Sequence, residues 1–176
     1  MFLLRTFLTL CLAFVAVSSH AQQRESVALF LRENLPRYAA MYRELHAAPE
    51  LSFEEKETSQ KMASQLRGLG FDVTERVGGY GVVGVLKNGA GPTLLLRADL
   101  DALPVVEETG LEYASKVRTV TQRGETVGVM HACGHDMHMT VLTASLDYLA
   151  HHRDEWQGTL IAMFQPAEEL GAGPRR

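Results

Sequence analysis

An eight-residue stretch, residues 131–138, carries side chains that can bind a metal ion. It reads His-Ala-Cys-Gly-His-Asp-Met-His and holds three of the chain's seven histidines and the one cysteine that follows residue 21. Cys133 and His135 are two residues apart, so an extended backbone directs both side chains to the same face. A thiolate and an imidazole suit a borderline-soft divalent cation such as zinc. The stretch predicts a metal site; the alternative is the polar start of a helix, with Asp136 as N-cap and the histidines in solvent.

Acidic residues follow two apolar segments that read as buried strands. Asp99 and Asp101 come after the first segment, and Glu168 and Glu169 come after the second. Because α/β sheets bind ligands beyond their strand ends, these carboxylates are candidate site residues. Adjacent residues face different ways, so one carboxylate of the Glu168–Glu169 pair can bind metal while the other activates a water molecule as general base. The alternatives are aspartates that form a turn and a glutamate pair in solvent.

Helical and strand patterns alternate along the rest of the chain. Helices are predicted at residues 23–45, 53–67 and 136–151, and strands at residues 71–76, 81–86, 93–98 and 158–164. Ser52 and Glu55 predict a capping box at the start of the second helix. The sequence Lys-Asn-Gly-Ala-Gly at residues 87–91 predicts a hairpin between the second and third strands. Helices between strands indicate an α/β layered domain with a mixed sheet.

Residues 1–21 have the pattern of a signal peptide. An early arginine precedes an apolar run, and the small residues Ser19 and Ala21 fit a cleavage site. The run is too short to span a bilayer, although an uncleaved membrane anchor is the alternative. We expect the mature chain to begin near Gln22 and to be exported from a bacterial cytoplasm to the periplasm or beyond. Cys133 would then have no disulfide partner, and metal coordination would protect its thiolate.

The composition is that of a globular domain. Hydrophobic residues make up 46% of the chain and charged residues 22%, with a formal net charge of −4. This balance excludes a disordered chain. The absence of a basic run argues against nucleic acid and against an anionic membrane surface as partners.

Four motifs occur in order between residues 46 and 169. They are HAAPELSFEE at residues 46–55, RADLDALP at residues 97–104, MHACGHD at residues 130–136 and FQPAEE at residues 164–169. Together they resemble the N-terminal part of the hippurate hydrolase and indole-acetyl-amino-acid hydrolase branch of the dinuclear metallo-aminoacylases and carboxypeptidases. The resemblance covers about residues 35–173.

The resemblance implies a role for each of five residues. Cys133, His135 and Glu169 would be metal ligands. Glu168 would be the general base, and Asp101 would be a catalytic residue that orients a metal ligand from behind.

Four other polar residues lie in or beside these motifs. Asp99 stands where the wider clan has a histidine, which leaves its role open. His131 and His138 would either hydrogen-bond to metal ligands or be structural. His46 is interpreted as structural, at the end of a helix.

The resemblance also implies a domain organisation. Residues 1–21 would be the signal peptide, and residues 22–176 the N-terminal portion of a zinc-exopeptidase-like catalytic domain. That domain would be a three-layer α/β fold, helix/mixed sheet/helix, truncated here so that the lid or dimerisation domain and the closing strands are absent.

The implied activity is hydrolysis of the amide bond of N-acyl amino acids such as hippurate. It would use two divalent metal ions, zinc or manganese, or else cobalt or nickel. The expected partner is a small-molecule N-acyl amino acid, with no nucleic acid, no membrane after signal cleavage, and a homodimer for the full-length form. Because the chain stops soon after Glu169, the alternative is a catalytically inactive truncated fragment, at most a weak metal binder, and we expect no activity from these 176 residues alone.

Overall fold

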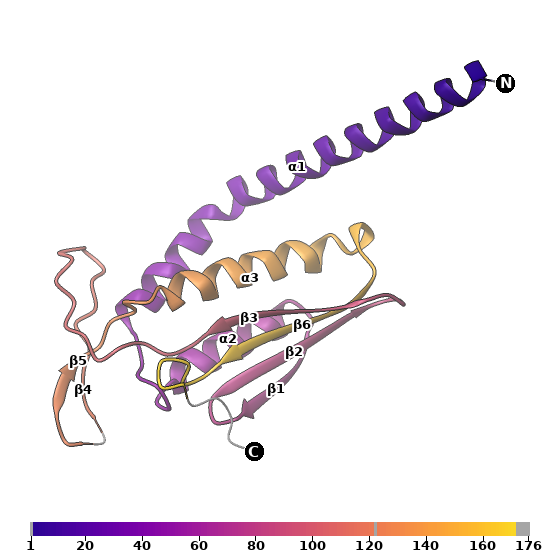
Figure 1. Cartoon of the computed structure of the whole chain (residues 1–176). Helices are drawn as coiled ribbons and strands as arrows, with labels where there is room; N and C mark the ends of the chain where they lie inside the picture. Colours follow the sequence, from indigo (N-terminus) through magenta and orange to yellow (C-terminus); the bar gives the residue numbers. More distant parts are fainter. Residues whose placement is uncertain (1, 122, 172–176) are drawn as a thin grey trace. The chain divides into compact units, whose positions relative to one another are not determined.

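The computed structural model describes residues 2–121 and 123–171, with side chains from Arg24 onward. The helices are α1 (Phe2–Ala47), α2 (Lys56–Gly68) and α3 (His135–His151), with a short 3-10 helix, η1 (Arg153–Glu155), after α3. The strands are β1 (Asp72–Val77), β2 (Gly81–Asn88), β3 (Thr93–Asp99), β4 (Arg118–Val120), β5 (Thr126–Gly128) and β6 (Gly158–Gln165) (Figure 1). Residues 172–176, on which the expected truncation partly depends, lie outside the described residues.

Two compact units divide the chain, Met1–Arg37 and Tyr38–Arg176. The helix α1 runs through the boundary between them and includes the whole of the helix predicted at residues 23–45. Within the described residues, no helix has both the length and the apolar character that a membrane crossing requires. Residues 1–21 fall where side chains are not described, so the signal peptide stays a prediction.

The main sheet has the strand order β1-β2-β6-β3 (Figure 1). The central strand β6 pairs antiparallel with β2 and parallel with β3, which confirms the predicted mixed sheet. Every predicted strand is present, whereas the short two-stranded sheet of β4 and β5 was not predicted.

The hairpin predicted at residues 87–91 is wrong, because β6 lies between the two strands that this connection joins. Alternate residues of β6, namely Leu160, Ala162 and Phe164, are almost fully buried, and a strand this apolar is most stable with a neighbour on each edge. Gly158 makes the insertion possible, since a Cβ at that position would lie 2.2 Å from the carbonyl oxygen of Pro92. The local turn sequence therefore does not decide the strand pairing, because burial of β6 between β2 and β3 outweighs it.

Helices α2 and α3 cover one face of this sheet. Gly84 in β2 and Ala162 in β6 are paired on that face, and a Cβ at Gly84 would lie 2.9 Å from Leu66 of α2. The same hydrophobic core includes Phe164 from β6 and Leu146 from α3. Burial of Phe164 alone contributes about 2–3 kcal/mol. The expected α/β class is confirmed, and the described residues supply one of the two helical layers of the three-layer arrangement.

The start of α2 does not contain the predicted capping box. The carboxylate of Glu50 accepts hydrogen bonds from the amides of Glu57 (3.0 Å) and Thr58 (2.8 Å), and so satisfies donors in the first turn. The side chains of Ser52 and Glu55 bond instead to residues that follow β3 and β6. The prediction was wrong because those distant partners compete with the local cap.

The parallel pairing of β3 with β6 brings two chain segments to the same edge of the sheet. Asp99 pairs with Gln165 at the last position of each strand. One residue further on, the amide of Leu100 donates to the carbonyl oxygen of Gln165 at 2.8 Å, so the two chains stay together as they leave the sheet. Asp101 and the Glu168–Glu169 pair therefore emerge side by side.

Candidate metal centre

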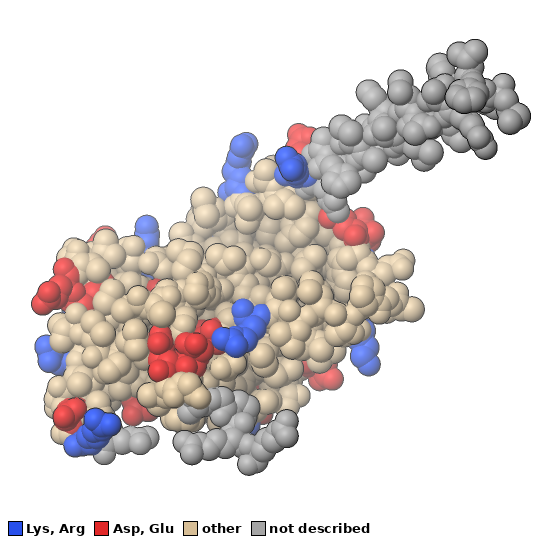
Figure 2. Space-filling view, in the orientation of Figure 1, with Lys and Arg blue, Asp and Glu red and all other residues tan. Residues whose placement is uncertain are grey.

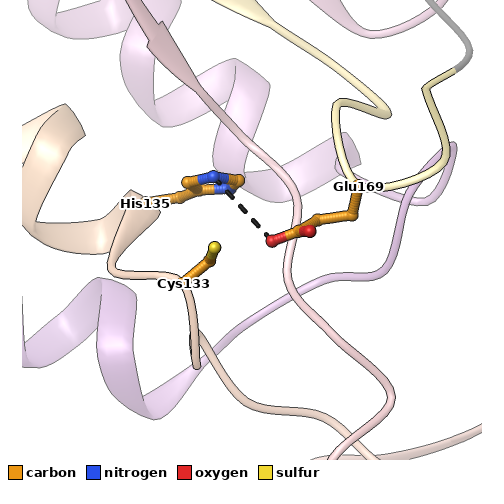
Figure 3. A group of neighbouring side chains, drawn as sticks. All are labelled: Cys133, His135 and Glu169. Carbon is orange, nitrogen blue, oxygen red and sulfur yellow. Dashed lines mark ion pairs between the residues drawn. The ribbon is translucent and has the colours of Figure 1, made fainter.

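Cys133, His135 and Glu169 converge beyond the ends of β3 and β6 (Figure 3). The sulfur of Cys133, a ring nitrogen of His135 and a carboxylate oxygen of Glu169 all lie within 4.8 Å of one another. His135 is buried, Glu169 is partly buried and Cys133 is exposed. The group therefore has a supported inner side and a side open to solvent, as a catalytic metal site needs.

A hydrogen bond to the main chain fixes the orientation of the His135 ring. Its Nδ1 lies 2.8 Å from the carbonyl oxygen of Asp101. Since a carbonyl oxygen can only accept, Nδ1 is the donor in this contact, and Nε2 is the ring nitrogen that remains for a metal ion. Nε2 faces the carboxylates of Glu168 (3.7 Å) and Glu169 (3.9 Å), which is the direction a metal ligand requires.

The carboxylate of Asp101 holds the chain that carries both glutamates. Its Oδ1 accepts from the amide of Glu168 (3.1 Å), and its Oδ2 accepts from the amide of Glu169 (3.0 Å). The hydroxyl of Ser52 donates to the same Oδ2 at 2.6 Å. These three bonds satisfy a side chain that is fully buried, where an unpartnered charge would be strongly unfavourable. Asp101 thus contacts His135 through its carbonyl group and the glutamates through its carboxylate.

A second group of donor atoms shares His135. One atom from each of Asp99, His135 and Glu168 lies within 4.8 Å of the others. Asp99 is the last residue of β3, and its Oδ2 accepts a hydrogen bond from Arg97 at 3.1 Å. Asp99 is therefore part of the strand and not simply a turn former. His135 has only one free ring nitrogen, so it can serve a cation in one of the two groups at a time.

The electrostatics of the site favour a cation. Asp99 Oδ1 and Glu169 Oε1 are buried atoms for which the described residues offer no hydrogen-bond donor. A hydrogen bond between the Cys133 thiol and the Glu169 carboxylate raises the pKa of Cys133, and the negative charge of Glu169 raises it further. An acidic patch lies over the turn that follows β6 (Figure 2). A divalent cation would partner the free oxygens and deprotonate the thiol, so the residues present fit a metal ion.

Behind the site, His46 at the end of α1 joins two acidic residues. Its Nδ1 lies 2.6 Å from Asp136 Oδ2, and its Nε2 lies 3.0 Å from Glu107 Oε1. Asp136 is therefore not the N-cap of α3; that position is Gly134, in the left-handed conformation at φ 79°. The structural interpretation of His46 agrees with this placement, and Glu107 was missed because it lies 61 positions from its partner.

The other two histidines of the motif have different surroundings. His131 is 4% exposed, and neither of its ring nitrogens has a hydrogen-bond partner among the described residues. Burial lowers the pKa of His131 to about 4, so the ring is neutral at pH 7. His138 is exposed, and its ring centroid lies 5.9 Å from that of His135.

We expect the pairing of His46 with Glu107 to make stability depend on pH. Burial by itself would lower the pKa of His46, but hydrogen bonds with Glu107 and Asp136 outweigh it and raise the pKa. Burial would raise the pKa of Glu107, but its hydrogen bonds lower it. The His46 contribution is therefore complete below the unfolded pKa of about 6.5 and is lost as pH rises through the folded value. The Glu107 contribution is present above about pH 4.5 and is lost as pH falls further.

His46→Gln should accordingly reduce the free energy of unfolding most at pH 5–6, by about 1–3 kcal/mol. The difference from the unmodified chain should shrink when urea denaturation is repeated at pH 8–9. An equal loss at both pH values would show that the imidazolium form of His46 does not contribute.

Comparison with known proteins identifies a family match and relatives for this chain. The model of peptidase family M20/M25/M40 matches residues 95–176. The chain is 42% identical over 134 residues to IAA-amino acid hydrolase ILR1-like 5 from Arabidopsis thaliana, an alignment that covers 76% of this chain and 29% of the relative. It is 46% identical over 131 residues to thermostable carboxypeptidase 1 from Saccharolobus solfataricus, covering 73% and 31%. It is 42% identical over 132 residues to N-acetyl-L-cysteine deacetylase from Bacillus subtilis, covering 74% and 30%.

Solved structures agree with these relatives. A putative aminohydrolase from methicillin-resistant Staphylococcus aureus has a TM-score of 0.76 and 36% identity, covering 85% of this chain and 36% of that one. The Bacillus subtilis YXEP protein, described as a dinuclear metal binding peptidase from the M20 family, has a TM-score of 0.69 and 39% identity, covering 78% and 36%.

The α/β domain is thus matched by both sequence and structure. Residues 95–176 match peptidase family M20/M25/M40, and the chain corresponds to the N-terminal portion of the relatives that it matches. It spans about a third of the length of the relatives it matches.

Proposed function

We propose that this chain contributes the Cys133–His135–Glu169 ligand group to a metal-dependent amidohydrolase of N-acyl amino acids. The observation that carries the proposal is the convergence of these three side chains within 4.8 Å, next to a second carboxylate at Glu168. The names of the relatives add the substrate class, since they include an amino acid conjugate hydrolase, an N-acetyl amino acid deacetylase and a carboxypeptidase. Cleavage of an amide between an acyl group and an amino acid is the reaction these names have in common. Export, predicted from residues 1–21, is part of the same proposal.

The ligand atoms in this proposal are Cys133 Sγ, His135 Nε2 and an oxygen of Glu169. A divalent ion held there, zinc or manganese in a two-metal centre, would supply Lewis-acid polarisation of the scissile carbonyl and would make water more acidic. Cobalt or nickel would suit the same mixed donor set.

Glu168 is placed to move protons beside that ligand group. Its side chain is 37% exposed, and its Oε2 lies 3.7 Å from His135 Nε2, so it faces both the ligands and the solvent side. Glu168 takes a proton from the attacking water molecule and returns it to the nitrogen of the leaving amino acid. Asp101 keeps Glu168 in this position through the hydrogen bond from the Glu168 amide.

Titration of the purified chain with Co²⁺ tests the ligand group. We expect a thiolate-to-cobalt charge-transfer band in the near ultraviolet, since Cys133 supplies the sulfur. Cys133→Ser should remove the band and lower the cobalt affinity by about 100-fold or more, because loss of a ligand costs at least as much as loss of its supporting contacts. Cys11→Ser, in a chain that keeps residues 1–21, is the matched control and should leave both unchanged.

Two results would contradict the proposal: no cobalt binding by the unmodified chain, or a band that persists in Cys133→Ser. Hippurate hydrolysis in the presence of Mn²⁺ or Zn²⁺ separates the enzyme from its alternative. Weak cobalt binding with no hydrolysis at any metal concentration would match an inactive fragment.

A further inference from the structure

We propose that Glu55 is a positioning residue that fixes the Glu168–Glu169 pair, an inference that rests on the metallohydrolase function proposed above. Glu55 immediately precedes α2 and has no exposed surface. Its Oε1 accepts a hydrogen bond from the amide of Ala167 at 2.8 Å, across 112 positions of sequence. A carboxylate this deeply buried is costly, so its presence at the back of the site calls for a specific partner.

The helix that follows Glu55 does not need this side chain. Glu50 already accepts from two amides in the first turn of α2, and Glu55 forms no side-chain cap. Burial is the main cause that raises the pKa of Glu55, while backbone amides, that of Ala167 among them, act in the opposite direction. The carboxyl group is therefore held by amides of the segment before α2 (those of Phe53 and Glu55) and by the Ala167 amide after β6, and it does not cap the helix.

The segment that Glu55 contacts has an unfavourable backbone. Ala167 has a φ of 53°, in the left-handed region that is unfavourable for a residue with a Cβ. That conformation turns consecutive amides toward one side, where they can surround a carboxylate. We call residues 167–169 the amide turn.

Two buried carboxylates accept every amide of this turn. Glu55 Oε1 takes the Ala167 amide, and Asp101 takes the amides of Glu168 (3.1 Å) and Glu169 (3.0 Å). A strained backbone persists only where its surroundings determine it fully, and Asp101 alone leaves the first amide unpartnered. Glu55 completes the support at the residue with positive φ. The directions of the Glu168 and Glu169 side chains therefore depend on Glu55.

The experiment replaces Glu55 in three ways. Glu55→Gln keeps an acceptor oxygen at the same reach, Glu55→Asp withdraws the acceptor by one methylene, and Glu55→Met fills the space with no acceptor. Glu50→Met is the matched control, because it removes a carboxylate from the same segment without contact to the amide turn. If Glu55→Met does not fold, Glu55→Asp provides the same comparison.

Two readouts report on the amide turn. The first is hydrogen exchange of the Ala167 amide in the metal-free chain, which Glu55→Met should accelerate about 10-fold or more, while Glu55→Gln stays near the unmodified rate. The second is cobalt affinity, which should fall about 10- to 100-fold in Glu55→Met and recover in Glu55→Gln. Glu50→Met should accelerate exchange in the first turn of α2 and leave both readouts unchanged.

The inference is overturned if Glu55→Met and Glu55→Asp leave the exchange of the Ala167 amide unchanged. It is equally overturned if Glu55→Met behaves as Glu50→Met does, since Glu55 would then be a residue of α2 alone. An unmodified chain that binds no cobalt would remove the proposed metallohydrolase function. The exchange of the Ala167 amide would still decide whether Glu55 holds the turn.

Discussion

Glu168→Gln is expected to lower kcat for hydrolysis of an N-acyl amino acid by about 10²- to 10⁴-fold, the contribution of a general base. Glutamine has nearly the same shape, and the amide of residue 168 would still donate to Asp101, so the turn should keep its conformation. What is lost is the ability of the side chain to accept a proton from water. The assay is the initial rate with hippurate and added Mn²⁺ or Zn²⁺, in a polypeptide that carries this chain at the length of its relatives.

Glu169→Gln provides the matched comparison, because it makes the same chemical change one residue further along. Glu169 belongs to the ligand group with Cys133 and His135, so its variant should lose cobalt affinity and recover activity as metal is added. Glu168→Gln should keep its cobalt affinity within about 3-fold and gain nothing from added metal. Near-native activity in Glu168→Gln, or the same metal dependence in both variants, would show that the two roles are assigned wrongly.

Helices and strands whose apolar residues recur with a clear period could be predicted from the sequence. The order of the strands in the sheet could not. The apolar residues of β6 identify a strand, yet nothing in the sequence around it says that β2 and β3 lie on its two edges. The glycines of residues 87–91 mark a bend in the chain but cannot say whether the strands they join are paired. Burial of Leu160, Ala162 and Phe164 decides that question, and burial depends on the whole domain.

The same contrast applies to the candidate site: residues with a local signal could be predicted, and contacts with distant partners could not. Cys133 and His135 stand out because their chemistry and spacing are local. Glu168 and Glu169 stand out because they follow an apolar strand, and the resemblance then assigned a role to each. Glu55 was misassigned because its partner, the Ala167 amide, lies 112 positions away.

The local capping-box rule applied equally well to Ser52 and Glu55, and only the fold shows that both side chains support the site instead. Asp101 illustrates the limit further. Its role in orienting a metal ligand was expected from the resemblance. Its hydrogen bonds with the amides of residues 168 and 169 depend on the parallel pairing of β3 with β6 and could not be predicted.

Asp101→Asn should have the largest effect on stability of the changes considered, with a loss of about 2–4 kcal/mol in the free energy of unfolding. Three donors converge on this fully buried carboxylate: the amides of Glu168 and Glu169 and the hydroxyl of Ser52. Asparagine replaces one acceptor oxygen with an NH₂ group, so at least one buried donor would face another donor. Urea denaturation at pH 7 measures the loss.

Asp99→Asn is the control for that change, since it alters the same type of side chain two residues earlier. Asp99 has one oxygen paired with the partly exposed Arg97 and one without a partner among the described residues, so its replacement should cost no more than about 1 kcal/mol. Equal losses in the two variants would mean that Asp101 is not the centre of the network. A larger loss in Asp101→Asn should bring weaker cobalt binding with it, because the turn that Asp101 holds also carries Glu169. Stability and metal affinity at this site would then depend on one carboxylate.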